Sequence, residues 1–233
     1  MKSRTALVLA GAAALLILVV APAGARPAPT PVVDVQPFAA IAPDGRSAAV
    51  QVIASCPERW TLLEAVVSVS QPQASGQASF PLTCAGYLQV FNVTVPVSDG
   101  VFDLGAVEVA ASVVVKRGKT ASAQDAKTIQ PSPIVAVDIA GTARLVEGGA
   151  TIDVTVACSG ETTGFESRLV ISRGLVVDLG TYTPFCDGTP HTHAVFVPTT
   201  LGPGAAQVLT FAQVEFAGQL FYGIDDGTIE IVG

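Results

Sequence analysis

The stretch PFCDGTPHTHAVFV (184–197) holds both histidines of the chain shortly after a cysteine. His191 and His193 are two positions apart, so on a β-strand their side chains point to the same face. Two imidazoles on one face, with the Asp187 carboxylate close in sequence, could begin a zinc or copper site. A stable site needs further ligands, and Cys186 is expected to be occupied in a disulfide. We therefore favour a solvated strand beside a disulfide, with no cofactor bound, over a metal site.

Other patterns of reactive residues give no catalytic centre. The sequence has no GxSxG elbow and no HExxH motif, and its carboxylates are scattered. Asp225-Asp226-Gly227 could contribute to a calcium site, but the spacing of oxygen ligands in a calcium loop is missing, and a β-turn between the last two strands is the preferred interpretation. The first repeat has Asp125 at the corresponding position. We predict that the protein is not an enzyme.

Carbohydrate binding generally requires exposed aromatic rings, and the chain has one tryptophan and three tyrosines. Trp60 follows Cys56 closely, at the start of an expected strand. We expect its ring to pack into the core or against a disulfide rather than to stack on a ligand.

The N-terminus has the composition of a secretory signal peptide. Lys2 and Arg4 precede an apolar run from about residue 5 to 20, and Ala23-Gly24-Ala25 is a small-x-small cleavage site. The run is shorter than the roughly 20 residues that a spanning helix needs, although an uncleaved anchor is the alternative. We predict a signal peptide at 1–25, a secreted product and no stable membrane insertion after cleavage.

Charge and composition narrow the class of partner. Removal of residues 1–25 leaves ten basic and 19 acidic residues, a net charge of −9. Nucleic acids are therefore not expected as partners, because their phosphates repel an acidic surface. The low content of charged residues and the many valines and threonines favour an all-β protein.

The chain contains an internal repeat. Cys56 and Cys84 are 28 residues apart, as are Cys158 and Cys186, and the two pairs are offset by 102 residues. The flanking sequences AVQVIASC and TIDVTVAC match with alternating apolar residues, and GAVEV matches GAAQV further on at an offset of 99. We predict a proline-rich leader at 26–36 and two homologous domains at 37–130 and 134–233.

Each repeat has the pattern of successive short strands separated by turn signals. We expect the strands of the first repeat near 38–42, 47–56, 62–70, 76–83, 88–97, 105–116 and 120–129. About seven strands in roughly 95 residues is typical of an immunoglobulin-like sandwich. The predicted fold is all-β, with two tandem immunoglobulin-like antiparallel β-sandwich domains and one intradomain disulfide each. The junction Gln130-Pro131-Ser132-Pro133 is stiffened by proline and predicts a semi-rigid rod.

Only pairing within a repeat keeps the two copies equivalent, so we assign Cys56–Cys84 and Cys158–Cys186. In each pair the cysteines lie at or just past the ends of the second and fourth expected strands. We therefore expect the bond to join two loops at one end of the sandwich, unlike the bond between sheet centres in antibody domains.

The run from VQVIASCP through the 28-residue cysteine spacing to LTCAGYLQVFNVTV and VFDLGAVEVAASVVV resembles uncharacterised secreted actinobacterial proteins with tandem disulfide-bearing immunoglobulin-like domains. The resemblance covers most of both repeats. It implies a secreted sandwich protein and brings no catalytic residues.

Two functional hypotheses are consistent with these sequence features. The first is a secreted, non-enzymatic binding module of the cell envelope or extracellular space, with an unknown protein or cell-surface partner. The alternative is an extracellular carrier of a small molecule or metal, held between the sheets, between the domains or at the histidines.

Overall fold

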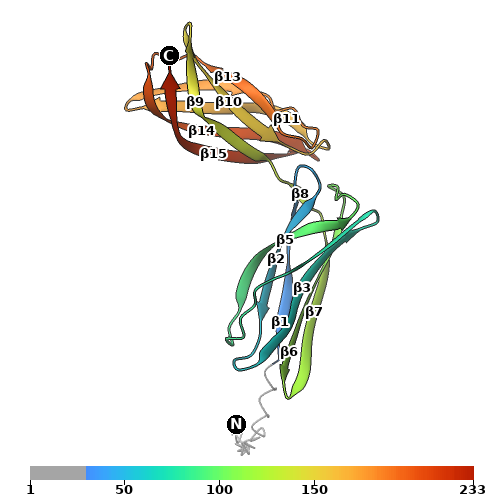
Figure 1. The fold of residues 1–233 in the computed structure, drawn as a ribbon. Helices are drawn as coiled ribbons and strands as arrows, with labels where there is room; N and C mark the ends of the chain where they lie inside the picture. The colour runs from blue at the N-terminus through green and yellow to red at the C-terminus, as the bar shows by residue number, and fades with distance from the viewer. Residues whose placement is uncertain (1–29) are drawn as a thin grey trace, which may run out of the picture.

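The computed structural model describes residues 30–233, so the signal peptide at 1–25 lies outside the described residues. This part of the chain is all-β (Figure 1). Within it, no helix is long and apolar enough to cross a membrane. The strands are β1 (Val32–Ile41), β2 (Ser47–Ser55), β3 (Thr61–Gln71), β4 (Ala74–Ser79), β5 (Gln89–Asp99), β6 (Val107–Arg117), β7 (Lys119–Ile129), β8 (Ser132–Pro133), β9 (Ala136–Val146), β10 (Gly149–Ala157), β11 (Thr163–Arg173), β12 (Val176–Tyr182), β13 (His191–Val197), β14 (Gly204–Phe216) and β15 (Gln219–Val232).

Strands β1–β7 form the first sandwich, here called domain 1. The neighbours β1, β2 and β5 make one half and β7, β6, β3 and β4 the other, and a short β4–β5 pairing joins them into one continuous sheet of order β7-β6-β3-β4-β5-β2-β1-β8. The opposite edges, β1 and β7, are linked by side chains: the Lys127 ammonium donates to the Asp34 carboxylate at 2.7 Å.

Strands β9–β15 form domain 2 with the same chain path. Its sheet has the order β12-β11-β14-β15-β9-β10-β13, so the two halves are joined by the parallel β15–β9 pairing and open between β12 and β13. The two domains therefore differ in which strand pair joins the halves. In domain 1 the halves are joined by β4 and β5, and in domain 2 by its first and last strands, β9 and β15. The predicted fold of two tandem β-sandwich domains is confirmed.

Alternation of apolar residues fills each interior. Along β6, for example, every second residue from Val107 to Val115 is buried, as expected for a strand with one face on the core. The two domains have separate hydrophobic clusters, made mainly of valine, alanine and isoleucine. These side chains fill the space between the two halves of each sandwich, which is therefore the hydrophobic core of that domain.

The first strand begins earlier than the sequence pattern indicated. Strand β1 starts at Val32, inside the 26–36 segment assigned to the leader. Pro37 lies where the β1–β2 register shifts between Val35 and Ala39. A proline lacks the N–H that a regular ladder needs, and it is tolerated at such an irregularity. The prolines therefore do not exclude a strand here.

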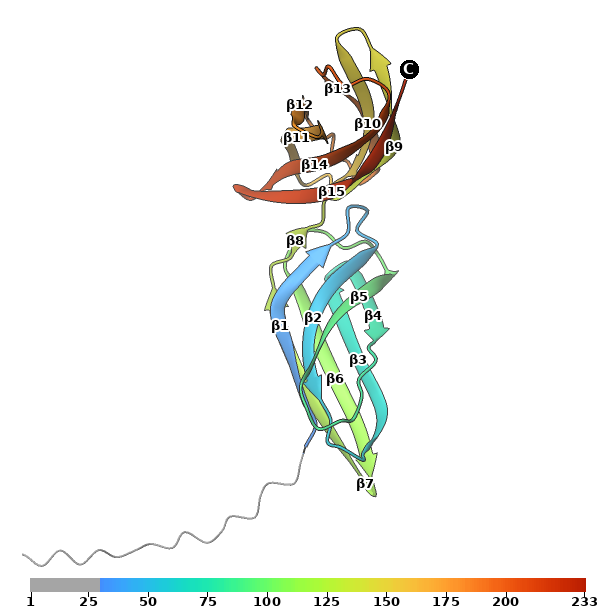
Figure 2. The ribbon, with the colours of Figure 1, turned by 90° about the vertical axis from the view of Figure 1, so that its left-hand side faces the viewer.

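The domains are stacked end to end (Figures 1 and 2). The β1–β2 turn of domain 1 lies at the junction between the domains. The N-terminal end of the described chain lies at the opposite end of domain 1. Strand β8, in the junction itself, pairs in parallel with the end of β1.

Candidate functional site

Both predicted disulfides are present, with Cα–Cα distances of 4.6 Å for Cys56–Cys84 and 4.8 Å for Cys158–Cys186. Cys56 directly follows β2, and Cys84 lies in the segment that leads into β5. Since β2 and β5 are antiparallel neighbours, the bond joins two loops at one end of the sandwich. Domain 2 repeats this arrangement with β10 and β13.

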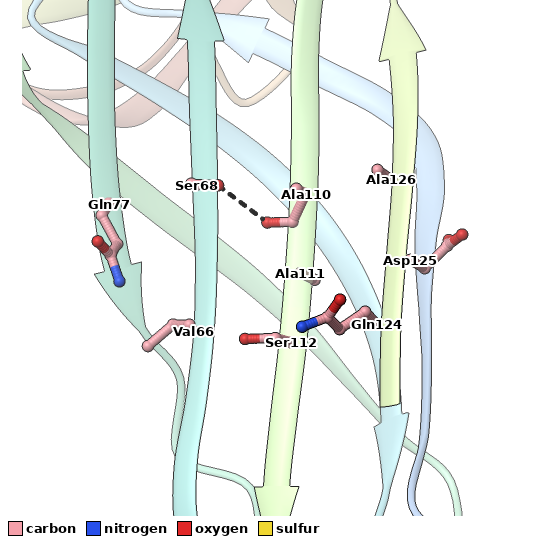
Figure 3. A pocket seen from close by; sticks show the side chains of 9 residues that line it. All are labelled: Val66, Ser68, Gln77, Ala110, Ala111, Ser112, Gln124, Asp125 and Ala126. Carbon is pink, nitrogen blue, oxygen red and sulfur yellow. Dashed lines mark hydrogen bonds between the residues drawn. The ribbon is translucent and has the colours of Figure 1, made fainter. Parts of the chain in front are cut away.

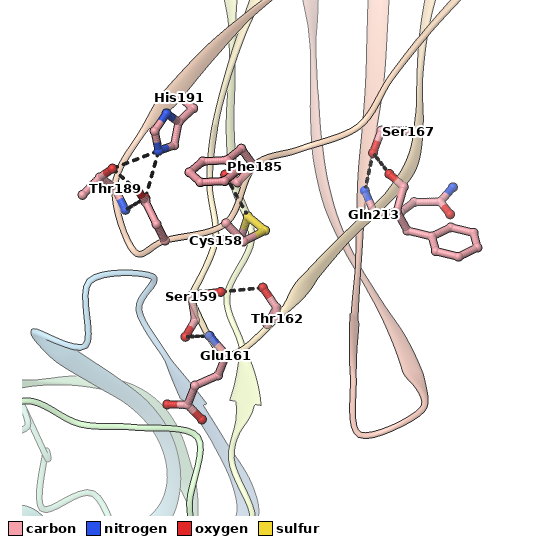
Figure 4. The surroundings of a disulfide bond; sticks show 12 residues. Cys158, Ser159, Glu161, Thr162, Ser167, Phe185, Thr189, His191 and Gln213 are labelled. Atoms are coloured by element: carbon pink, nitrogen blue, oxygen red, sulfur yellow. Dashed lines mark hydrogen bonds and ion pairs between the residues drawn. A yellow bond between two sulfur atoms is a disulfide. The ribbon is translucent and has the colours of Figure 1, made fainter.

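The second disulfide lies at the joint between the domains. Residues 159–161 follow Cys158, and residues 187–189 follow Cys186. Both short loops face domain 1 across a cleft between the domains. The Gly188 N–H donates to the Cys158 carbonyl at 2.9 Å and links the two loops. Figure 4 shows Glu161 pointing toward the loops of domain 1. The bond therefore fixes the surface that domain 2 presents to domain 1.

The joint is held by main-chain and side-chain contacts. The Leu104 N–H of domain 1 donates to both carboxylate oxygens of Glu161, each at 3.2 Å. The Gln130 side-chain amide donates to the Leu104 carbonyl, and the Ile134 N–H donates to the Ile41 carbonyl at 2.9 Å. Phe216 of domain 2 packs against the hydrophobic cluster of domain 1. The sequence pattern did not single out Glu161, whose equivalent in the first repeat is Arg59.

A cleft of about 580 Å³ opens between the domains and is lined by four carboxylates. Each of the four, Asp44, Asp103, Glu161 and Asp187, accepts a hydrogen bond from a main-chain N–H. No group of three or more histidine, cysteine or acidic side chains within residues 30–233 could hold a metal ion together. These carboxylates order loops of the joint.

His191 belongs to this joint through Asp187. Its Nε2 lies 2.9 Å from the Asp187 carboxylate, and its ring meets Phe185 edge-on at 4.9 Å (Figure 4). Hydrogen bonds from the Thr189 hydroxyl and N–H, with a further one from His191, lower the pKa of the Asp187 carboxyl to about 2. Asp187 is thus an anion that holds the turn between Cys186 and β13.

His193 lies on the same face of β13 as His191 but in a different environment. Its ring packs on Tyr182 with 5.6 Å between centroids, and its Nε2 is buried without a hydrogen-bond partner. Burial lowers the pKa of the imidazole below 6.5, and His191 lowers it further. The favoured interpretation, a solvated strand without a metal, and the alternative of a metal site at His191 and His193 both stay predictions. The Nε2 atom of His191 is hydrogen-bonded to Asp187, whereas that of His193 is buried without a partner.

The prediction of a turn at Asp225-Asp226-Gly227 is wrong. These residues lie within β15, and the hairpin turn is at Ala217-Gly218 instead. Asp225 accepts the Ile139 N–H at 2.9 Å and so links β15 to β9. Asp125 accepts the Val35 N–H at 2.8 Å in the same way. The presence of an aspartate at this position in both repeats is the sequence feature that could have indicated this link between strands.

Trp60 is partly buried and packs against the hydrophobic cluster of domain 1, which confirms the expected packing. Its indole Nε1 is buried without a partner. The ring therefore contributes to the core beside the Cys56 loop.

A groove of about 500 Å³ lies on the outer face of domain 1. Figure 3 shows its lining side chains along adjacent strands, including Gln77 on β4, Ser68 on β3, Ser112 on β6 and Gln124 on β7. The groove thus runs over one sheet face, where short side chains leave a shallow depression between longer ones.

No protein-family model matches the chain, and no curated protein matches it. Among solved structures, it is similar to a tetra-tandem repeat in the extending region of a large adhesion protein, with 15% identity and a TM-score of 0.32. The match covers 87% of this chain and 49% of that one, so the chain spans about half the length of that structure. A similarity at this level carries no inference about function.

Proposed function

We propose that this chain is a secreted, non-enzymatic two-domain rod that holds binding surfaces for a protein or cell-surface partner at a fixed separation. In this proposal residues 1–25 are its signal peptide. The acidic net charge supports a partner other than nucleic acid.

The observation that carries the proposal is the construction of the joint. The chain between the domains is short and forms β8, which extends the sheet of domain 1. Glu161 accepts from Leu104 across the joint, and Phe216 packs on the neighbouring core. Domains that lack such contacts move relative to one another, whereas these contacts restrain the pair. A restrained pair of sandwiches suits a spacer that presents its faces in one orientation.

The first experiment is native mass spectrometry, before and after reduction, on protein purified from its own culture supernatant. We expect the mass of residues 26–233 less four hydrogens, with nothing bound. The immobilised protein is then expected to retain a partner from cell-wall or secretome fractions, and unfolded, reduced protein serves as the control. A small molecule or metal that leaves on denaturation would instead favour a carrier, and the absence of any partner would contradict the binding role.

A further inference from the structure

The outward face of the four-stranded half of domain 2 is unusually apolar. Strand alternation turns every second residue of β12, β14 and β15 away from the core. The large apolar side chains at these positions are here called the apolar face: Val177, Leu179, Leu209, Phe211, Tyr222 and Ile224. Val177, Tyr222 and Ile224 are 64%, 55% and 61% exposed.

These side chains form one continuous patch. Val170 pairs with Leu179 on one side and with Leu209 on the other, and its side chain shares their face. Phe211 pairs with Ile224 on the next strand. The patch therefore crosses all four strands of this half. Two charged side chains border it on the same face: Arg168, which pairs with Phe211, and Asp226, which pairs with Leu209.

Domain 1 shows that the fold does not require apolar residues here. Ser112 pairs with Gln124 as Phe211 pairs with Ile224, and Ser68 pairs with Gln77 as Val170 pairs with Leu179. The registers are the same in the two domains. The six positions that correspond to the apolar face carry Ser75, Gln77, Ala110, Ser112, Ser122 and Gln124. The same sheet is thus stable with small or polar residues, so the apolar face serves something other than folding.

The geometry points to a second copy of this chain as the occupant of the apolar face, in a two-fold symmetric dimer. A two-fold interface brings the same patch of both copies together, so the patch must be complementary to itself. Flat apolar sheet faces meet this condition, because two sheets pack face to face about 10 Å apart with interleaved side chains.

The size of the face suits such a dimer. Four strands about 4.8 Å apart and outward positions about 6.7 Å apart along each strand give a face on the order of 20 by 25 Å. Its accessible surface exceeds this projected area because the side chains stand above the sheet. A stable interface of standard size buries about 800 Å² on each partner. The apolar face of one copy, together with its polar rim, approaches that value.

The charges at the rim are also complementary between copies. Arg168 pairs with Phe211 and shares its face, and its ion pair with Glu166, at 3.8 Å, is solvent-exposed. Glu215 and Asp226 extend from the same face on β14 and β15. Arg168 of either copy can therefore meet a carboxylate of the other around an apolar centre, which is the usual anatomy of a protein interface.

The test is sedimentation velocity of the mature chain, residues 26–233, over a wide concentration range. We expect a reversible dimer. Replacing the six residues by their domain 1 counterparts (V177S, L179Q, L209A, F211S, Y222S and I224Q) should raise the dissociation constant roughly a hundredfold or more. The double variant Y222S/I224Q alters only exposed side chains of β15 and should raise it at least several-fold. Circular dichroism and thermal melting establish that both variants fold.

Leu88→Ser is the matched control, because Leu88 is 63% exposed and lies in domain 1, just before β5 and away from the apolar face. It should leave the dimer unchanged. Added salt should tighten the dimer, since it screens the net repulsion between two acidic chains and strengthens apolar association. The weakening of the ion pairs at the rim should be the smaller effect, because solvent-exposed ion pairs contribute little. A chain that stays monomeric, a dimer that survives the six replacements, or a dimer that salt dissociates would each overturn the proposal. The first of these results would assign the face to a different partner.

Discussion

At the residue scale, the two domains place different pairs of aromatic rings at one equivalent position. Domain 1 places Phe80 against Phe91 with 5.0 Å between ring centroids, and domain 2 places Tyr182 against His193. The Tyr182 hydroxyl lies 2.9 Å from the hydroxyl of Thr210, which is fully buried. His193 occupies the position of Phe91, which packs against the core of domain 1, and its buried Nε2 has no hydrogen-bond partner.

This environment predicts a pH dependence. The folded-state pKa of His193 is lowered, so below 6.5 the unfolded chain binds more protons than the folded one. The stability of domain 2 is therefore complete above pH 6.5 and should fall as the pH is lowered beneath it. Replacing His193 by Phe, as in domain 1, should remove this decline and raise the melting temperature at pH 5. Calorimetry across this pH range measures the effect.

The control is His191→Gln, which copies Gln89 of domain 1 and should keep most of the decline. Asp187, whose lowered pKa acts in the range between 3.8 and about 2, contributes only at more acidic pH. A decline between pH 7 and 5 that persists unchanged in His193→Phe would show that another group causes it.

At the scale of elements, each disulfide joins the loop after one strand to the segment before its neighbour. The Cys56–Cys84 bond lies at the end of domain 1 away from the joint, and the Cys158–Cys186 bond supports the loops that contact domain 1. The same covalent link therefore has a local role in one domain and an additional role at the joint in the other.

Replacing Cys158 and Cys186 by Ala should lower the stability of domain 2 by about 3 to 4 kcal/mol on the chain-entropy model. It should also broaden the distribution of interdomain orientations, because the loops around Glu161 lose their link. Replacing Cys56 and Cys84 by Ala should cost domain 1 a similar amount and leave the joint unchanged. Chemical unfolding and small-angle scattering distinguish these effects, and equal scattering from the two variants would contradict the asymmetry.

At the scale of the whole molecule, the joint determines how the two sandwiches act together. Glu161 provides the acceptor for the buried Leu104 N–H, while β8 and Phe216 supply further contacts. Removing one of these contacts should loosen the joint without unfolding either domain.

We expect Glu161→Ala to raise the population of other interdomain orientations roughly fivefold, since one hydrogen bond contributes about 1 kcal/mol. Residual dipolar couplings or scattering would report the change. Glu161→Gln keeps an acceptor oxygen and should lie near the wild type. If Glu161→Ala behaves as the wild type does, the β8 pairing and Phe216 suffice to restrain the domains.

The sequence by itself determined the repeat, the pairing of the cysteines and most strands. Cysteine spacing and period-two alternation are local properties of the chain, and both occur in each of the two repeats. The sequence pattern placed Asp225 in a turn and β1 too late, because a carboxylate that bridges strands and a proline at a register shift depend on residues far along the chain. Only the tertiary structure decided the roles of His193, Glu161 and the apolar face. Burial of a ring, a contact across a joint and the adjacency of side chains on four strands all arise from register and packing between distant segments, which no local pattern encodes.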